Sequence, residues 1–169
     1  MLDYFATLAR YNSWANRRIY AAVSELDNEA IVATRTGFFP SLLKTLNHLV
    51  VADRIWLGRL TAQPETNLNA LDEVLHPDFA ELRAARLALD DRLIRYIDDL
   101  DPKRFAENLV YKTVAGVPHE TPFSLVLAHM FNHQTHHRGQ THGMLSGTAV
   151  PPPSLDIIYY LREAQQGRG

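Results

Sequence analysis

Four long stretches of the chain place apolar side chains at the spacing of one helix face, and this periodicity constrains the fold most strongly. The stretches cover about residues 2–25, 41–60, 79–100 and 122–146, which allows about five to seven helical turns each. A helix with one apolar face is stable only when that face packs against another element. The sequence therefore predicts an all-α fold, a four-helix bundle, in which side chains from facing helices can converge on one site.

Polar residues at the ends of these stretches predict where the helices begin and end. Ser41 is placed to cap the second helix, because a serine hydroxyl can accept a hydrogen bond from a free amide of the first turn. Thr121 followed by Pro122 predicts the cap and the first residue of the fourth helix. Asp27 and Asn28 are expected to end the first helix.

Two shorter elements complete the predicted fold. Residues 108–121 alternate weakly around Ala115 and Gly116, which predicts a small hairpin before the last long helix. Three prolines at 151–153 form a stiff connector, after which Ser154 is expected to cap a short C-terminal helix. Since there is no internal repeat and no linker, residues 1–169 are expected to form a single domain.

The composition excludes several classes of chemistry. The 169 residues include no cysteine, so disulfides, thiolate metal sites and a cysteine nucleophile are ruled out. The formal net charge is −2, and no basic stretch predicts binding to nucleic acid. No apolar run approaches the ~20 residues of a membrane span. We therefore expect a soluble protein without a membrane partner, and a cytoplasmic one by default.

Histidine is the residue type with an unusual distribution. Four of the eight histidines lie between residues 129 and 137. On a helix, residues three or four apart share a face, and two imidazoles placed in this way can bind one metal ion. The pairs His129/His133, His133/His137 and His133/His136 all have suitable spacing, so spacing alone leaves three pairs open.

A helical wheel favours one of these pairs. It places His133 and His137 within the apolar arc of the fourth helix, about 40° and 80° around the axis from His129. His129 and His136 lie near the edge of this arc, where we expect them to orient ligands or to line the pocket entrance. The wheel therefore favours His133 and His137 as the inward pair.

Other polar residues fall on faces that the pattern predicts to be buried. Gln134 and Arg138 lie in the same arc as the inward histidines, so the arc is not purely apolar and the wheel separates inward from outward positions less clearly. Asn12 lies on the inward stripe of the first helix and is expected to be either a buried hydrogen-bonding group or a pocket residue. Asp53 and Arg54 are interpreted as an ordinary solvated pair.

A third ligand should come from another helix, and His48 is the other histidine that periodicity places on a core-facing stripe. A single histidine on such a face is most often a hydrogen-bonded core residue, but the cluster on the fourth helix favours a shared metal site. The expected ligands are His48, His133 and His137, which leave an open coordination position. Imidazole ligation suits zinc, nickel, iron or copper, and we expect one of the first three.

Three stretches resemble the conserved motifs of a known family. YNSWANRRI at 11–19, HLVVADRIWL at 48–57 and HMFNHQTHHRGQ at 129–140 are similar to the motifs of the DinB/YfiT-like metalloenzymes, in the same order. LDIIYYLRE at 155–163 resembles the usual ending of that family. The resemblance implies a four-helix bundle with a divalent metal on one histidine of the second helix and two of the last long helix. Matched motif by motif, these ligands are His48, His133 and His137, the same residues that the helical wheel and periodicity favour.

The resemblance also implies a class of function. Some family members resemble transferases or isomerases that use a low-molecular-weight thiol such as bacillithiol or mycothiol, and dimers are common, so we expect a homodimer. A chain without cysteine must obtain any thiol from a cosubstrate. Our leading hypothesis is therefore a thiol-dependent transferase acting on a small-molecule electrophile. A metal-dependent hydrolase is the second hypothesis, and a non-catalytic metal-binding stress-response protein is the third.

Overall fold

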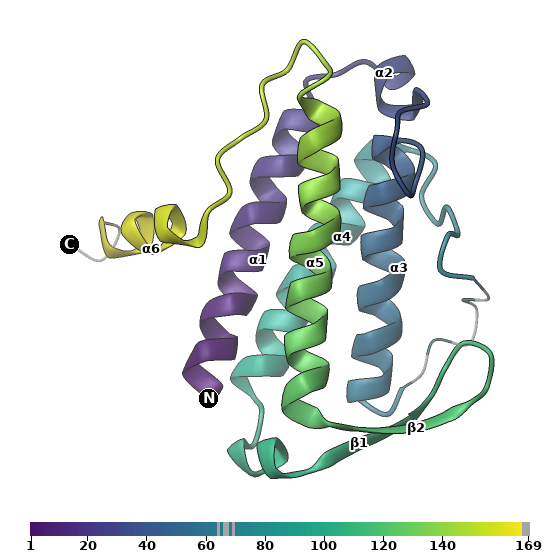
Figure 1. The fold of residues 1–169 in the computed structure, drawn as a ribbon. Helices are drawn as coiled ribbons and strands as arrows, with labels where there is room; N and C mark the ends of the chain where they lie inside the picture. The colour runs from purple at the N-terminus through teal and green to yellow at the C-terminus, as the bar shows by residue number, and fades with distance from the viewer. Residues whose placement is uncertain (64, 66–67, 69, 167–169) are drawn as a thin grey trace.

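Four long helices packed side by side form the body of the molecule in the computed structural model, which describes residues 1–63, 65, 68 and 70–166 (Figure 1). The helices are α1 (Leu2–Val23), α3 (Leu42–Leu60), α4 (Phe79–Asp98) and α5 (Phe123–Leu145). α1 and α5 run in one direction and α3 and α4 in the other, and each helix packs chiefly against two others. The predicted all-α bundle is confirmed.

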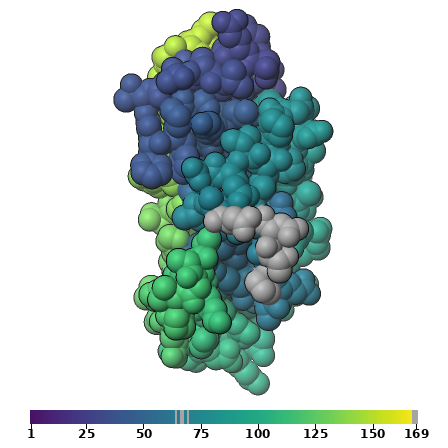
Figure 2. Space-filling view, turned by 90° about the vertical axis from the view of Figure 1, so that its right-hand side faces the viewer, coloured from purple at the N-terminus to yellow at the C-terminus, as the bar shows by residue number. Residues whose placement is uncertain are grey.

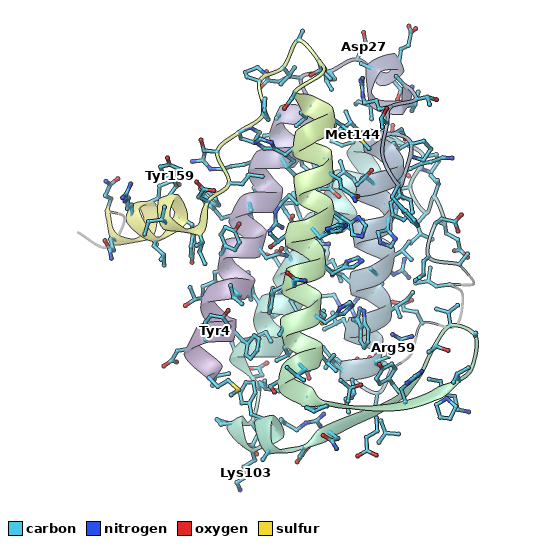
Figure 3. All side chains as sticks on the ribbon, in the orientation of Figure 1. Tyr4, Asp27, Arg59, Lys103, Met144 and Tyr159 are labelled. Atoms are coloured by element: carbon cyan, nitrogen blue, oxygen red, sulfur yellow. The ribbon has the colours of Figure 1, made fainter. Side chains whose placement is uncertain are left out.

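One hydrophobic core joins the four helices along their inward faces. Each helix contributes side chains that are completely buried, such as Ile19, Leu46, Leu82 and Leu127. Each of these residues lies on an apolar stripe with helical spacing, so burial of the stripes holds the bundle together. Tyr4 and Tyr159, which lie near the two ends of the chain, are by contrast exposed to solvent (Figure 3).

The start of α3 agrees with the sequence, whereas the start of α5 does not. The Ser41 hydroxyl accepts a hydrogen bond from the Lys44 amide at 3.1 Å, which confirms the predicted cap. α5 begins one residue later than predicted, at Phe123, and has no side-chain cap. Thr121 was expected to be this cap but lies in a strand, where its hydroxyl is 3.4 Å from the Tyr111 hydroxyl. Strand pairing thus replaces the cap that the local pattern indicated.

A two-stranded hairpin closes one end of the bundle, as the sequence predicted. β1 (Asn108–Lys112) pairs with antiparallel β2 (Pro118–Pro122), and Leu109 lies opposite Thr121. Gly116 in the turn has φ of 81°, a backbone conformation that glycine adopts without a steric penalty. Two strands alone are only marginally stable, and the buried Leu109 side chain anchors this pair in the helical core.

Two short helices occupy connections, and a third lies at the C-terminal end of the described chain. α2 (Asn28–Val32) is capped by the Asp27 side chain, which accepts a hydrogen bond from the Ala30 amide at 2.7 Å. The first long helix ends at Val23, so Asp27 begins the next helix instead of ending the first. η1 (Pro102–Ala106) is a 3-10 helix before the hairpin, and α6 (Ile157–Gln166) lies against α1. α6 starts beyond Ser154, which was expected to cap it. No described helix is long and apolar enough to cross a membrane.

A layer of buried charges crosses the core between α3 and α4. Arg86 of α4 lies 2.8 Å from an oxygen of Asp53 on α3 and 2.9 Å from an oxygen of Asp90. Asp53 is only 2% exposed, so the expected solvated Asp53–Arg54 pair is wrong. Arg54 instead pairs with Glu65 at 2.7 Å. Burial alone would lower the pKa of Arg86, but the two carboxylates outweigh it and hold this pKa above its ordinary value.

The same layer continues into α1 and α5. Arg138 donates hydrogen bonds to the side-chain oxygens of Asn12 at 2.6 Å and Asn16 at 2.9 Å. Both asparagines in turn donate to Asp90, at 3.2 and 3.0 Å. Gln134 donates to Asp53 at 2.5 Å. The layer therefore contains two buried cations and two buried anions, with Arg86 paired directly and Arg138 connected through the asparagines, and it links all four helices.

We predict that removing the buried cation destabilises the fold far more than removing an exposed one. Arg86→Met leaves two buried carboxylates without a cation, so the free energy of unfolding should fall by about 3–5 kcal/mol. The matched control is Arg10→Met, which breaks a pair with Asp98 whose side chains are 44% and 40% exposed. This control should cost less than about 1 kcal/mol. Urea unfolding followed by circular dichroism measures both changes, and equal losses would contradict the prediction.

Candidate metal centre

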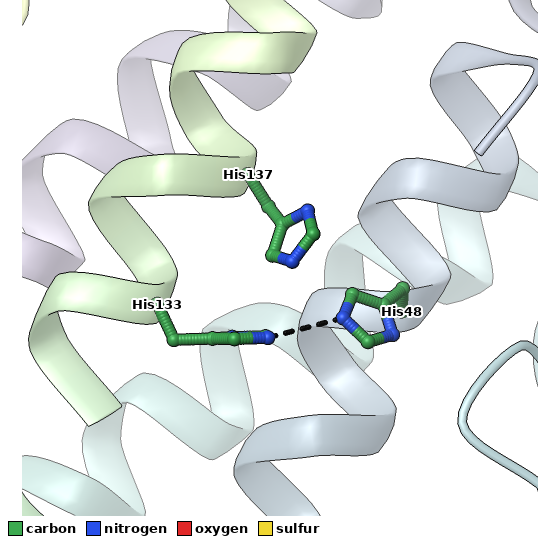
Figure 4. A group of neighbouring side chains, drawn as sticks. All are labelled: His48, His133 and His137. Carbon is green, nitrogen blue, oxygen red and sulfur yellow. Dashed lines mark hydrogen bonds between the residues drawn. The ribbon is translucent and has the colours of Figure 1, made fainter. Parts of the chain in front are cut away.

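Three histidine side chains from two antiparallel helices meet beside the core. His48 projects from α3, and His133 and His137 project from successive turns of α5 (Figure 4). One ring nitrogen from each residue lies within 4.8 Å of those of the other two. The structure thus brings together the three histidines that the sequence selected, and it does so because α3 packs directly on α5.

Oxygen acceptors set the orientation of two of the rings. The Nδ1–H of His48 donates to the carbonyl of Leu71 at 2.7 Å, and the Nδ1–H of His137 donates to the side-chain oxygen of Gln140 at 2.8 Å. A carbonyl or amide oxygen only accepts hydrogen bonds, so both rings carry their proton on Nδ1. Their Nε2 atoms therefore carry the lone pairs that could bind a metal, and in this structure the Nε2 of His48 accepts a hydrogen bond from the Nε2–H of His133 at 3.1 Å (Figure 4).

An aromatic side chain covers one side of the group. The buried Phe39 ring, from the segment before α3, stacks on His48 with 4.2 Å between ring centroids. It also lies 5.6 Å from the centroid of His137. This ring keeps water away from that side and prevents the His48 ring from rotating out of position.

The surroundings keep all three imidazoles neutral. Burial lowers the pKa of His48, His133 and His137 below the ordinary histidine value. The effect is largest for His133, whose pKa is lowered to about 3 by burial and then by the neighbouring histidines. A histidine binds a metal only through an unprotonated nitrogen. The pocket therefore already favours the ligand form of these side chains.

The two outer histidines of the cluster lie beside the inner ones, as the wheel indicated. His136 and His129 are both exposed, and their ring centroids lie 4.8 Å from His137 and 5.6 Å from His133, respectively. Gln140 joins one outer ring to an inner one, because its amide nitrogen donates to His136 Nε2 at 3.1 Å. This places His136 in the chain of groups that orients His137.

The donor set fits a divalent transition metal. Three neutral imidazoles are suitable ligands for such an ion, and in the described part of the chain no carboxylate joins the group. Asn12, considered above as a buried hydrogen-bonding group or a pocket residue, belongs to the buried polar layer and binds Arg138 and Asp90. Three protein ligands without a fourth are typical of catalytic metal sites, which keep one position for water or substrate.

Comparison with known proteins identifies the family of the chain. The sequence matches the DinB family over residues 1–168. The chain belongs to the DinB family. It is 25% identical over 173 residues to Protein DinB of Bacillus subtilis (strain 168), across 98% of this chain and 99% of that protein. A DinB-like protein from Bacillus cereus ATCC 10987 has a similar fold, with a TM-score of 0.63 and 16% identity over 83% of this chain and 89% of that chain.

Three groups that shape the centre of this DinB family protein were not found from the sequence. Gln140 lies three residues after His137 and therefore on the same helix face, so helical spacing could have suggested it. The Leu71 carbonyl and the Phe39 ring come from segments outside the long helices. No local pattern marks them, because their positions depend on how those segments fold back over α3.

We predict that metal binding requires the three inner histidines but not the two outer ones, His129 and His136. Replacing His48, His133 or His137 with alanine should leave the purified DinB family protein with well below one ion per chain, because each supplies a nitrogen to the group. His136→Ala and His129→Ala should keep close to one. Elemental analysis after dialysis measures the ratio. The choice within the cluster is wrong if His136→Ala loses the metal while His137→Ala keeps it.

We also predict that the metal-free protein loses stability in mild acid. The pKa of His133 is about 3 in the folded state and about 6.5 in the unfolded chain. Below about pH 6.5 the unfolded chain therefore binds a proton that the folded state does not, and the free energy of unfolding decreases as the pH falls. Urea unfolding at pH 7.5, 6.5 and 5.5 measures this decrease, which should be smaller in His133→Ala. His119→Ala, which removes an exposed histidine, should behave like the parent.

Proposed function

We propose that this DinB family protein holds one divalent ion on His48, His133 and His137 and activates a small nucleophile. The nucleophile is a low-molecular-weight thiol or water, and it attacks a small organic electrophile. The observation that carries this proposal is the convergence of three neutral imidazoles without a fourth ligand from the described residues. Such a site leaves room for an exchangeable molecule.

The surrounding side chains have defined tasks in this proposal. A bound divalent ion would lower the pKa of a thiol or water molecule held beside it and so favour the nucleophilic form. The Leu71 carbonyl and Gln140 hold the proton of two rings on Nδ1 and keep both Nε2 atoms directed inward. Phe39 excludes water from one side. These contacts preorganise the ligands before any substrate arrives.

Thiol transfer ranks above hydrolysis because the motifs of the chain resemble those of family members that use a low-molecular-weight thiol. With no cysteine in its 169 residues, the protein cannot supply a sulfur nucleophile, so a thiol must enter as a cosubstrate. An open position beside three imidazoles accepts a thiolate as readily as a hydroxide. A thiol-dependent transferase is therefore the leading proposal, and a metal-dependent hydrolase is the alternative at the same site.

A purely structural role for the metal, as in a non-catalytic metal-binding stress-response protein, has less support. Structural metal sites are usually closed by four protein ligands and hold together domains that cannot fold without the ion. Here the buried layer around Arg86 and a continuous apolar core already join α3 to the other helices. We therefore expect the bundle to fold without an ion.

We predict that the metal-loaded protein conjugates thiols to small electrophiles. The assay incubates zinc-, nickel- or iron-loaded protein with bacterial low-molecular-weight thiols and a panel of halogenated, epoxide and maleyl compounds, and it follows product formation. His137→Ala should lose at least about 100-fold in rate, whereas His119→Ala should retain the parent rate. Equal rates in the parent and His137→Ala, for thiols and for hydrolytic substrates alike, would reject the enzymatic proposal.

A further inference from the structure

A second concave site lies between α3 and the hairpin. It is a cavity of about 410 Å³, within the range of small-molecule sites in proteins. The face of the molecule in Figure 2 is hollowed between the hairpin, in green, and the α3 surface, in blue. Six of its lining residues carry the argument: Ile55, Arg59, Leu68, Tyr111, Lys112 and Val114.

The cavity has two cationic side chains that no anion neutralises. Arg59 and Lys112 make no ion pair or hydrogen bond through their side chains with any described residue. The acidic side chain in the lining, Glu65, is already bound by Arg54, with contacts of 2.7 and 3.2 Å. The lining therefore attracts negative charge from solution.

Aromatic rings hold the Arg59 side chain in place. Its guanidinium carbon lies 4.5 Å from the centroid of the Trp56 ring and 5.0 Å from that of Tyr111, at the end of α3 near the hairpin (Figure 3). A guanidinium positioned by ring faces keeps its N–H groups available for a planar anion. Partial burial lowers the pKa of Arg59, but an arginine remains charged at neutral pH.

Much of the rest of the lining is apolar, which favours a ligand with an apolar body as well as a negative charge. Ile55, Leu68 and Val114 contribute apolar side chains to the lining. An inorganic anion would satisfy the cations but leave these side chains in contact with water. We propose that this cavity binds a small organic anion, a carboxylate carried on an apolar body.

The cavity lies next to the histidine group. The Trp56 ring contacts His129 at 5.2 Å between centroids, and His129 lies 5.6 Å from His133. Along α3, Ile55 follows His48 by seven residues, or about 10 Å. A molecule anchored in the cavity can thus present its other end to the metal centre. That the anion is part of the substrate rests on the proposed function, whereas its binding in the cavity does not.

A direct binding experiment on the metal-free protein tests the proposal. The probe is 4-phenylbutyrate, followed by nuclear magnetic resonance of the two indole N–H groups. Trp56 borders Arg59 and Tyr111, whereas Trp14 lies on α1 against α6 and serves as the internal reference. Trp14→Phe assigns the two signals. We expect a saturable shift of the Trp56 signal and no shift of the Trp14 signal.

Matched ligands and variants separate charge from apolar contact. The neutral amide 4-phenylbutyramide, and inorganic phosphate as an anion without an apolar body, should each bind at least tenfold more weakly. Arg59→Gln and Lys112→Gln should each weaken 4-phenylbutyrate binding by about tenfold, the effect of losing one charge-assisted hydrogen bond. Arg92→Gln, which removes an exposed arginine of α4, should leave it unchanged. Equal affinity for the acid and the amide, or for Arg59→Gln and the parent, overturns the proposal.

The outcome also separates this inference from the proposed function. If His133→Ala still binds 4-phenylbutyrate but no variant or parent retains metal, the proposed function fails and the cavity assignment stands. If the parent holds metal and Trp56 does not respond to the probe, the cavity assignment alone fails. Circular dichroism of each variant confirms that the fold is intact before either conclusion is drawn.

Discussion

The buried ion pairs of Arg86 constrain the whole bundle. Its guanidinium lies between Asp53 of α3 and Asp90 of its own helix, and the three side chains are at most 3% exposed. A buried charge without its partner costs several kcal/mol, whereas an apolar contact tolerates small shifts. The helices can therefore pack closely only in the register that pairs these groups. Apolar stripes alone would allow neighbouring registers with similar burial.

This constraint extends to the histidine group through α5. Gln134 and Arg138 directly follow His133 and His137 in the chain, and both are held inside the bundle by hydrogen bonds to the buried layer. Successive side chains on a helix point about 100° apart. Because Gln134 and Arg138 are anchored in the core, His133 and His137 point toward α3, where they meet His48. The fold and the candidate metal centre thus depend on the same interactions.

The chain segments between the helices supply further groups around the histidines and the cavity. The Leu71 carbonyl determines which nitrogen of His48 carries the proton, and Phe39 covers the rings. The hairpin completes a cavity beside the end of α3 and adds Tyr111 to the arginine–aromatic stack. Helices therefore place the histidines and Gln140, and the connecting segments determine which nitrogen of His48 is protonated and cover one side of the group.

Sequence patterns were sufficient to predict the four helices, the cap at Ser41 and the three histidines that meet, because helical spacing is a property of neighbouring residues. The packed structure was needed to show that Asp53 is a buried partner of Arg86 and that Thr121 belongs to a strand. Solvated and buried carboxylates look alike in a sequence, and their difference depends on residues far along the chain. The same holds for the Leu71 carbonyl at His48, since every residue has a carbonyl and only packing selects one of them.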